Sequence, residues 1–170
     1  MATANKSAVS VARTVHGGPP LVESYPEAAS QTFKKGEAVY LDGSGNIAEF
    51  TAAIDDATQD FIGYAAEDGH NDAAVDTTRK TMVYVRAGNV FEANVTAAGS
   101  DQITAKTQVG TVYPMYQDTT NSIIMVDISD TSGQADACRI VRISPKGTVG
   151  DTNGRVEFEV VTGTVQVHAE

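Results

Sequence analysis

The chain has 170 residues, and its 41% hydrophobic content is enough for one packed domain or two small ones. The formal net charge of −10 argues against a role in nucleic-acid binding. No apolar run approaches the roughly 18 residues of a membrane span. With 6% aromatic residues, no Trp and 15 Gly, the composition favours short strands over long helices. We therefore expect an all-β protein that contacts neither nucleic acid nor a membrane.

Residues 1–30 differ from the rest of the chain, because they are small and polar and contain the run Gly17-Gly18-Pro19-Pro20. Proline blocks helix and central-strand hydrogen bonding, so this segment predicts an extended arm. Its valines alternate imperfectly over 7–15, which suits a strand added to a partner's sheet edge; the alternative is a terminus without a partner. The apolar residues expected to dock the arm are Val9, Val11, Val15, Leu21 and Tyr25.

Ten short runs beyond the arm predict strands, since they are rich in β-branched and aromatic residues and are separated by glycine and Asx turns. They lie at 38–41, 47–50, 61–66, 81–87, 90–96, 111–116, 122–128, 138–143, 155–161 and 164–168. No segment sustains a 3.6-residue period, so we expect very little helix. The body is then a small β-barrel or sandwich.

Two sequence features bear on how this body is divided. The run 36–46 parallels 110–121, and each is followed by a strand that ends in arginine, Arg86 or Arg142. A duplication would explain the parallel, and so would two generic hairpins. We accordingly expect a β-module over 31–98, followed over 99–170 by a second β-lobe or a continuation of the same domain.

The last clear strand and the single cysteine give local predictions. Alternation over 155–161 places Val156, Phe158 and Val160 toward a core. The residues that it places toward water are Arg155, Glu157 and Glu159. Cys138 lies in an apolar run and is expected to be a buried small hydrophobe.

Residues that could carry catalysis or bind a metal form no recognisable pattern. The three histidines, His16, His70 and His168, are not set beside a nucleophile, and no phosphate-binding glycine loop occurs. Asp42-x-Ser44-x-Asn46 imitates the first ligands of a calcium loop, but the required glycine and glutamate are replaced. We expect no enzyme activity, no metal and no cofactor.

Acidic residues are concentrated between 36 and 78, where ten Asp and Glu occur without any Lys or Arg. One interpretation is a solubilising face, and the other is the solvent-facing side of a protein docked through its opposite face.

Three short patterns in the middle of the chain are similar to those of a known family. They are Lys35-Gly36-x-x-Val39-x-Leu41-Asp42, then Phe61-Ile62-Gly63-x-Ala65, then Val83-x-Val85-x-x-Gly88-x-Val90. Their order resembles the decoration (cement, or head-stabilising) proteins of tailed-bacteriophage capsids. The resemblance implies a structural virion protein on the capsid exterior, made in the host cytoplasm. It also implies that the arm docks on the major capsid protein, and that a homotrimer bridges and stabilises neighbouring capsid subunits.

A second function stays open at this point. A β-rich module of a phage head fibre or tail that binds carbohydrate or a host surface would share these features. Its candidate contact residues are Tyr113 and Tyr116, which flank Pro114.

Overall fold

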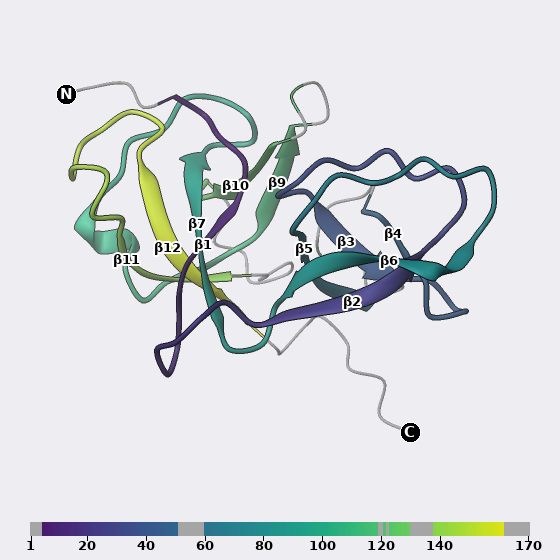
Figure 1. The fold of residues 1–170 in the computed structure, drawn as a ribbon. Helices are drawn as coiled ribbons and strands as arrows, with labels where there is room; N and C mark the ends of the chain where they lie inside the picture. The colour runs from purple at the N-terminus through teal and green to yellow at the C-terminus, as the bar shows by residue number, and fades with distance from the viewer. Residues whose placement is uncertain (1–4, 51–59, 119–120, 122, 130–137, 162–170) are drawn as a thin grey trace.

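The structure is a computed structural model, which describes residues 5–50, 60–118, 121, 123–129 and 138–161 (Figure 1). This part of the chain forms strands and a single 3-10 turn, which confirms the all-β expectation. The elements are β1 Ser10–Thr14, β2 Val22–Glu27, β3 Ala38–Leu41, β4 Ile47–Glu49, β5 Asp60–Ala65, β6 Asp76–Val85, β7 Asn89–Thr96, η1 Lys106–Gln108, β8 Val112–Tyr113, β9 Met115–Asp118, β10 Ile123–Asp127, β11 Cys138–Ile143 and β12 Arg155–Val160. No helix among these residues is long and apolar enough to cross a membrane.

The first lobe is a closed barrel with the strand order β2-β4-β3-β5-β6. Its neighbours are antiparallel, except that β2 meets β4 in parallel through Glu27 and Ile47. The turn between β3 and β4 is held by Asp42, whose carboxylate accepts hydrogen bonds from the amides of Ser44 and Asn46, each at 2.8 Å. The buried residues at its centre are Phe33, Val39, Ile47, Ala65 and Val83.

The second lobe is a seven-stranded sheet with the order β8-β11-β12-β7-β10-β9, to which β1 is added alongside β7. Strand β7 is central: β12 lies along one edge, while β1 and β10 share the other edge at opposite ends. All eight residues of β7 are buried. The expected run 111–116 divides into β8 and β9 at Pro114, because proline lacks the amide that would continue the ladder.

Aromatic side chains join the two lobes into one packed body. Tyr64 of β5 lies with its ring centroid 4.7 Å from that of Phe91 in β7 and 6.2 Å from that of Phe158 in β12. On the barrel side the series continues through edge-to-face contacts of Phe61, Phe50 and Tyr40. One hydrophobic cluster therefore contains residues from both lobes.

The described part of the chain crosses between the lobes twice, from β1 to β2 and from β6 to β7 (Figure 1). Asn89 ties these two crossings together. Its side-chain oxygen accepts a hydrogen bond from the amide of Leu21 at 3.0 Å. Its side-chain nitrogen, Nδ2, donates hydrogen bonds to the backbone carbonyls of Leu21 and Val85, both at 2.8 Å. Asn89 is 1% exposed, so these bonds are shielded from water.

The extended N-terminal arm expected over residues 1–30 is not confirmed. Strand β1 pairs with β7, and β2 pairs with β6 and β4, so both belong to the chain's own sheets. The alternation over 7–15 suits any open strand edge, and β7 supplies one within the same molecule. Pro19 and Pro20 fall in the connection between β1 and β2, where no ladder hydrogen bond is needed. The expected strand at 164–168 lies outside the described residues.

Candidate functional site: a charged pocket on the sheet lobe

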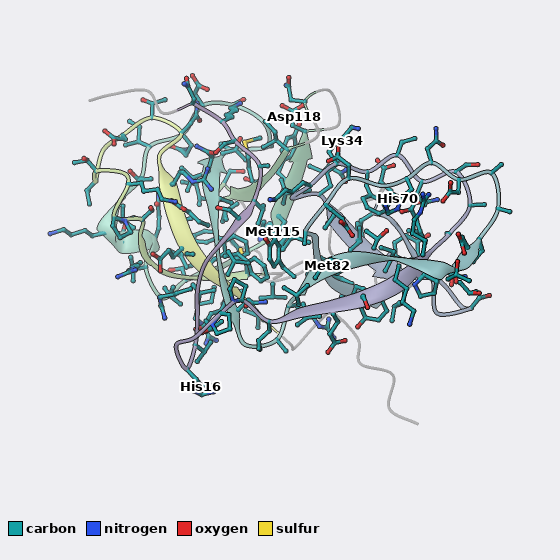
Figure 2. The ribbon with its side chains drawn as sticks, in the orientation of Figure 1. His16, Lys34, His70, Met82, Met115 and Asp118 are labelled. Carbon is teal, nitrogen blue, oxygen red and sulfur yellow. The ribbon has the colours of Figure 1, made fainter. Side chains whose placement is uncertain are left out.

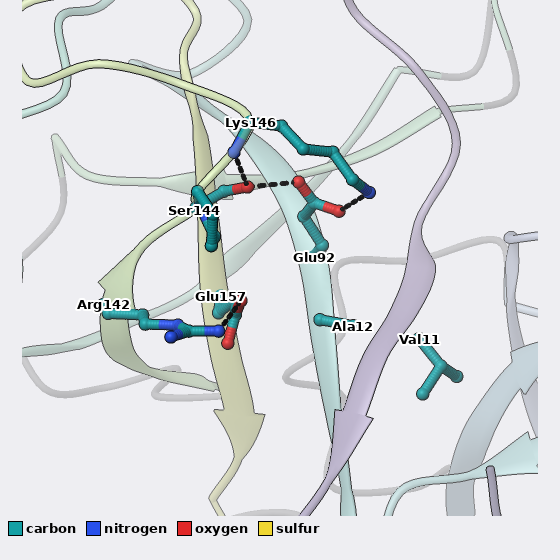
Figure 3. A pocket seen from close by; sticks show the side chains of 8 residues that line it. Val11, Ala12, Glu92, Arg142, Ser144, Lys146 and Glu157 are labelled. Carbon is teal, nitrogen blue, oxygen red and sulfur yellow. Dashed lines mark hydrogen bonds and ion pairs between the residues drawn. The ribbon is translucent and has the colours of Figure 1, made fainter. Parts of the chain in front are cut away.

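A pocket of about 200 Å³ opens on the sheet lobe, between β1, β7, β12 and the loop that follows β11 (Figure 3). Val11, Ala12 and Pro145 form its apolar walls. Its polar lining residues are Glu92, Arg142, Ser144, Lys146 and Glu157.

Two buried carboxylates form the base of this pocket. Glu92 of β7 and Glu157 of β12 are directly paired across the strands, and they are 1% and 3% exposed. The expectation that Glu157 faces water is therefore wrong. Arg13, from β1, places Nε 3.1 Å from one of its carboxylate oxygens, and Arg142, from β11, places a guanidinium nitrogen 2.6 Å from the other. Arginines from strands on both sides thus cover Glu157, which would otherwise be solvated.

Glu92 is held by three other groups. The Ser144 hydroxyl donates to it at 2.5 Å, the Lys146 ammonium at 2.6 Å, and Arg155 Nε lies 3.1 Å away. Burial alone would raise the pKa of Glu92, but the hydrogen bonds from Lys146 and Ser144 and the nearby positive charges outweigh it. The pKa of Glu92 is consequently below its usual 4.5, and the residue is a carboxylate at neutral pH.

The site carries an excess of positive charge. Arg13, Arg142, Lys146 and Arg155 surround two carboxylates, and these four are a third of the 12 Lys and Arg residues of the chain. Because the carboxylates already accept bonds from these cations, they are poorly placed to exchange protons with a bound molecule. The cations at the rim, in contrast, can attract an anion.

A second cluster of titratable groups lies on the barrel and centres on the buried Glu27. His70 Nδ1 is 3.0 Å from a Glu27 oxygen, and the hydroxyl of Thr81 donates to the same oxygen at 2.9 Å. Thr81 is 0% exposed and approaches the same ring nitrogen, at 3.2 Å. In a catalytic triad the nucleophile is open to substrate and bonds the imidazole nitrogen that does not contact the carboxylate. Thr81 is buried and approaches the same nitrogen that contacts Glu27. This cluster therefore fastens the 66–75 loop to β2 and β6 and does not form a triad.

The structure separates the residues predicted to dock an arm. Val9 is buried at 4% exposure in the hydrophobic cluster that joins the lobes, and Val11 packs against that cluster. Tyr25 packs against the barrel core. Val15 and Leu21 remain exposed, at 45% and 48%. They flank the protruding β1–β2 loop, which carries His16 (Figure 2).

The two tyrosines considered for glycan binding do not form a stacking surface. Tyr113 is 5% exposed and belongs to the hydrophobic cluster that joins the lobes, so its ring faces cannot receive a sugar. Tyr116 is half-buried, with its hydroxyl close to Gly99. Within the described ranges, no group of three or more His, Cys, Asp or Glu is arranged to hold a metal ion.

Sequence patterns gave little indication of the charged pocket. The cations that bond its two carboxylates lie at positions 13, 142, 146 and 155, and only the pairing of β1 with β7 brings the first of them near the others. One signal was present: Glu92 and Glu157 both lie within predicted strands among apolar neighbours, where a buried acid requires a cationic partner.

Comparisons of the chain with models of known protein families, with curated proteins and with solved structures found no match. The function is therefore inferred from the residues and their geometry.

Proposed function

We propose that this protein is a structural virion component that binds the outer surface of an assembled phage capsid and stabilises it by bridging neighbouring subunits. It acts without catalytic chemistry. Its partners are the major capsid protein and further copies of itself, as a homotrimer. The three short patterns at 35–42, 61–65 and 83–90 support the proposal through their resemblance to capsid decoration proteins.

The observation that carries the proposal is the shared core of the two lobes. A clamp must transmit force between its attachment points, so its parts must resist moving apart. The contact of Tyr64 with Phe91 and Phe158, together with the bonds of Asn89 to both crossings, opposes separation of barrel and sheet. Packed aromatic residues deform little, which suits a mechanical role.

The docking contact is the loop between β1 and β2. It presents Val15 and Leu21, two apolar side chains that the chain leaves exposed, on a segment that projects from the body (Figure 2). A single loop of this size buries little area. Binding through several copies in one oligomer raises the total affinity, because each later contact forms at high effective concentration.

Co-sedimentation with empty, expanded capsids that lack their accessory protein tests this function. We expect saturable binding of the unchanged chain and weaker binding of the double variant Val15→Ser with Leu21→Ser. Val149→Ser is the matched control, since Val149 is also 45% exposed but lies in the β11–β12 connection. The proposal is wrong if the unchanged chain does not bind a cognate capsid; equal loss in the control would exclude the loop as the docking contact.

A further inference from the structure

We propose that the charged pocket of the sheet lobe binds a carboxylate side chain presented by an acidic segment of a partner protein. This inference goes beyond the proposed function and does not depend on it, because it concerns a different face and a different chemistry from the apolar β1–β2 loop.

The first argument is the number of donors left over at the pocket. Arg142 uses one terminal nitrogen on Glu157, and Arg13 uses its Nε on the same carboxylate. Each guanidinium has five N–H donors, and both side chains are about half exposed, at 50% and 42%. Lys146 gives one hydrogen bond to Glu92 and is more exposed still. Three exposed cations therefore have N–H donors beyond those that bond the buried carboxylates.

The second argument is the charge of the site relative to the rest of the chain. The pocket is lined by two cations, Arg142 and Lys146, and by two acids. Arg13 and Arg155 bond the same two carboxylates from outside the lining, so the cluster as a whole has an excess of two positive charges on a protein with a formal net charge of −10. An anion is repelled by most of the surface and attracted here, so the pocket steers it. The planar fork of arginine matches a carboxylate in two parallel hydrogen bonds.

The third argument is the size and lining of the pocket. A volume of about 200 Å³ lies below the roughly 300–1,000 Å³ of sites that enclose drug-sized ligands, so it admits one side chain. Ala12 and Pro145 offer apolar contact for the methylene stem of a glutamate, while the carboxylate meets Arg142 and Lys146. Figure 3 shows Ala12, Arg142 and Lys146 around the two acids.

These features favour an acidic protein segment over a nucleic acid. A long polyanion would extend from the pocket across a surface on which acids outnumber Lys and Arg by 22 to 12. Only four cations contact the two carboxylates of the pocket, and these acids lie between them, so the cluster forms no continuous basic track for a phosphate backbone. A short segment with one inserted carboxylate needs only the local excess.

Nuclear magnetic resonance titration of the full chain tests the inference, with the Nε–Hε signals of Arg13 and Arg142 as the readout. The probes are a capped peptide in which Gly and Glu alternate, the same peptide with Gln in place of Glu, and inorganic phosphate. We expect the Glu peptide to shift both signals saturably, and the Gln peptide to leave them unchanged. Arg142→Gln should weaken binding about tenfold, as expected for one charged hydrogen-bonding group.

Arg139→Gln is the matched control, because Arg139 is an exposed arginine of the same strand that neither lines the pocket nor pairs with Glu92 or Glu157 among the described residues. It should bind the Glu peptide as the unchanged chain does. Equal shifts with the Glu and Gln peptides, no shift at all, or a response to phosphate alone, which would mean an adventitious ion only, would each overturn the inference. The unchanged chain decides these outcomes, so misfolding of a variant cannot hide them.

Discussion

The ring of Tyr64 in the barrel lies 4.7 Å from the ring of Phe91 in the sheet lobe, at an interplanar angle of 65°. The two side chains are fully buried, and Phe158 adds a third ring to the contact. Aromatic pairs in this edge-to-face range stabilise a structure beyond their buried area. The pair therefore couples two sheets that share no ladder hydrogen bonds within the described part of the chain.

Replacing Phe91 by alanine should destabilise the whole molecule, by about 3–5 kcal/mol, because it leaves a cavity where the lobes meet. The unchanged chain should unfold in denaturant in one step, so that tyrosine fluorescence and backbone circular dichroism give coincident transitions. Phe33→Ala, which empties a site in the separate barrel core, is the comparison. Two well-separated transitions in the unchanged chain would show that the lobes are not coupled.

Removing the hydroxyl of Tyr64 should leave stability unchanged or raise it, by about 1 kcal/mol. The phenol oxygen is buried and has no hydrogen-bond partner among the described residues, so Tyr64→Phe removes an unsatisfied polar group. Thr81→Val is the matched control, since the Thr81 hydroxyl is equally buried but donates to Glu27. The control should be destabilised, as measured by urea unfolding. A marked loss of stability in Tyr64→Phe would contradict the assignment.

The same burial raises the pKa of the Tyr64 phenol well above its usual 10.0, and the neighbouring Cys138 adds to the effect. The pKa of Tyr25 is also raised, to about 12. Burial is the largest cause, and the hydrogen bond and charge interaction with Glu23 add to it. Alkaline titration of tyrosine absorbance should therefore lose one late-ionising group in Tyr64→Phe. An unchanged titration curve would argue against burial of this phenol.

Stability should depend on the ionisation of Glu92. Its pKa in the folded chain is below 4.5, so the carboxylate contributes stability that is present above pH 4.5 and is lost as the pH falls through the folded value. Unfolding free energies of the unchanged chain and of Glu92→Gln should differ most near pH 7 and converge below pH 4.5. A difference that stays constant over this range would refute the linkage.

Replacing Asn89 by alanine should weaken the connection between the lobes. It leaves the Leu21 amide and the carbonyls of Leu21 and Val85 without this partner, at a cost of about 1–3 kcal/mol for each group that stays buried. Hydrogen exchange at the Leu21 amide should become faster. Asn121→Ala, at an exposed turn, should change neither stability nor that exchange rate. Unaltered exchange at Leu21 in Asn89→Ala would exclude this role.

The strands that sequence alone predicts best are those with clear local patterns. The bounds of β3 and β11 agree with prediction, because each is a short run rich in strand-forming residues and is followed by turn or polar residues. Strands β1 and β2 were missed as parts of the body. The glycine, proline and small polar residues around them indicate an arm unless the strand edge with which each pairs is known. For β1 that edge is β7, almost eighty residues further along the chain, and for β2 the edges are β4 and β6.

The candidate site could be predicted less well, for a related reason. Alternation in β12 places Val156 and Phe158 correctly in the core, but it cannot show that the other face is covered. Glu157 is buried because Arg13 and Arg142 arrive from strands on either side. Local periodicity predicts which face of the strand a residue occupies. Strand order determines which other residues cover that face.

The ion pair between Arg13 and Glu157 joins positions that are 144 residues apart, and this has a consequence for biosynthesis. A ribosome makes β1 first, yet the edge of β7 and the carboxylate of β12 emerge only much later. Until then β1 lacks its pairing partner, and Val9 lacks the core that buries it. The nascent chain must therefore hold an open, partly apolar strand until β7 has been made, a state in which chaperones or neighbouring chains can capture it.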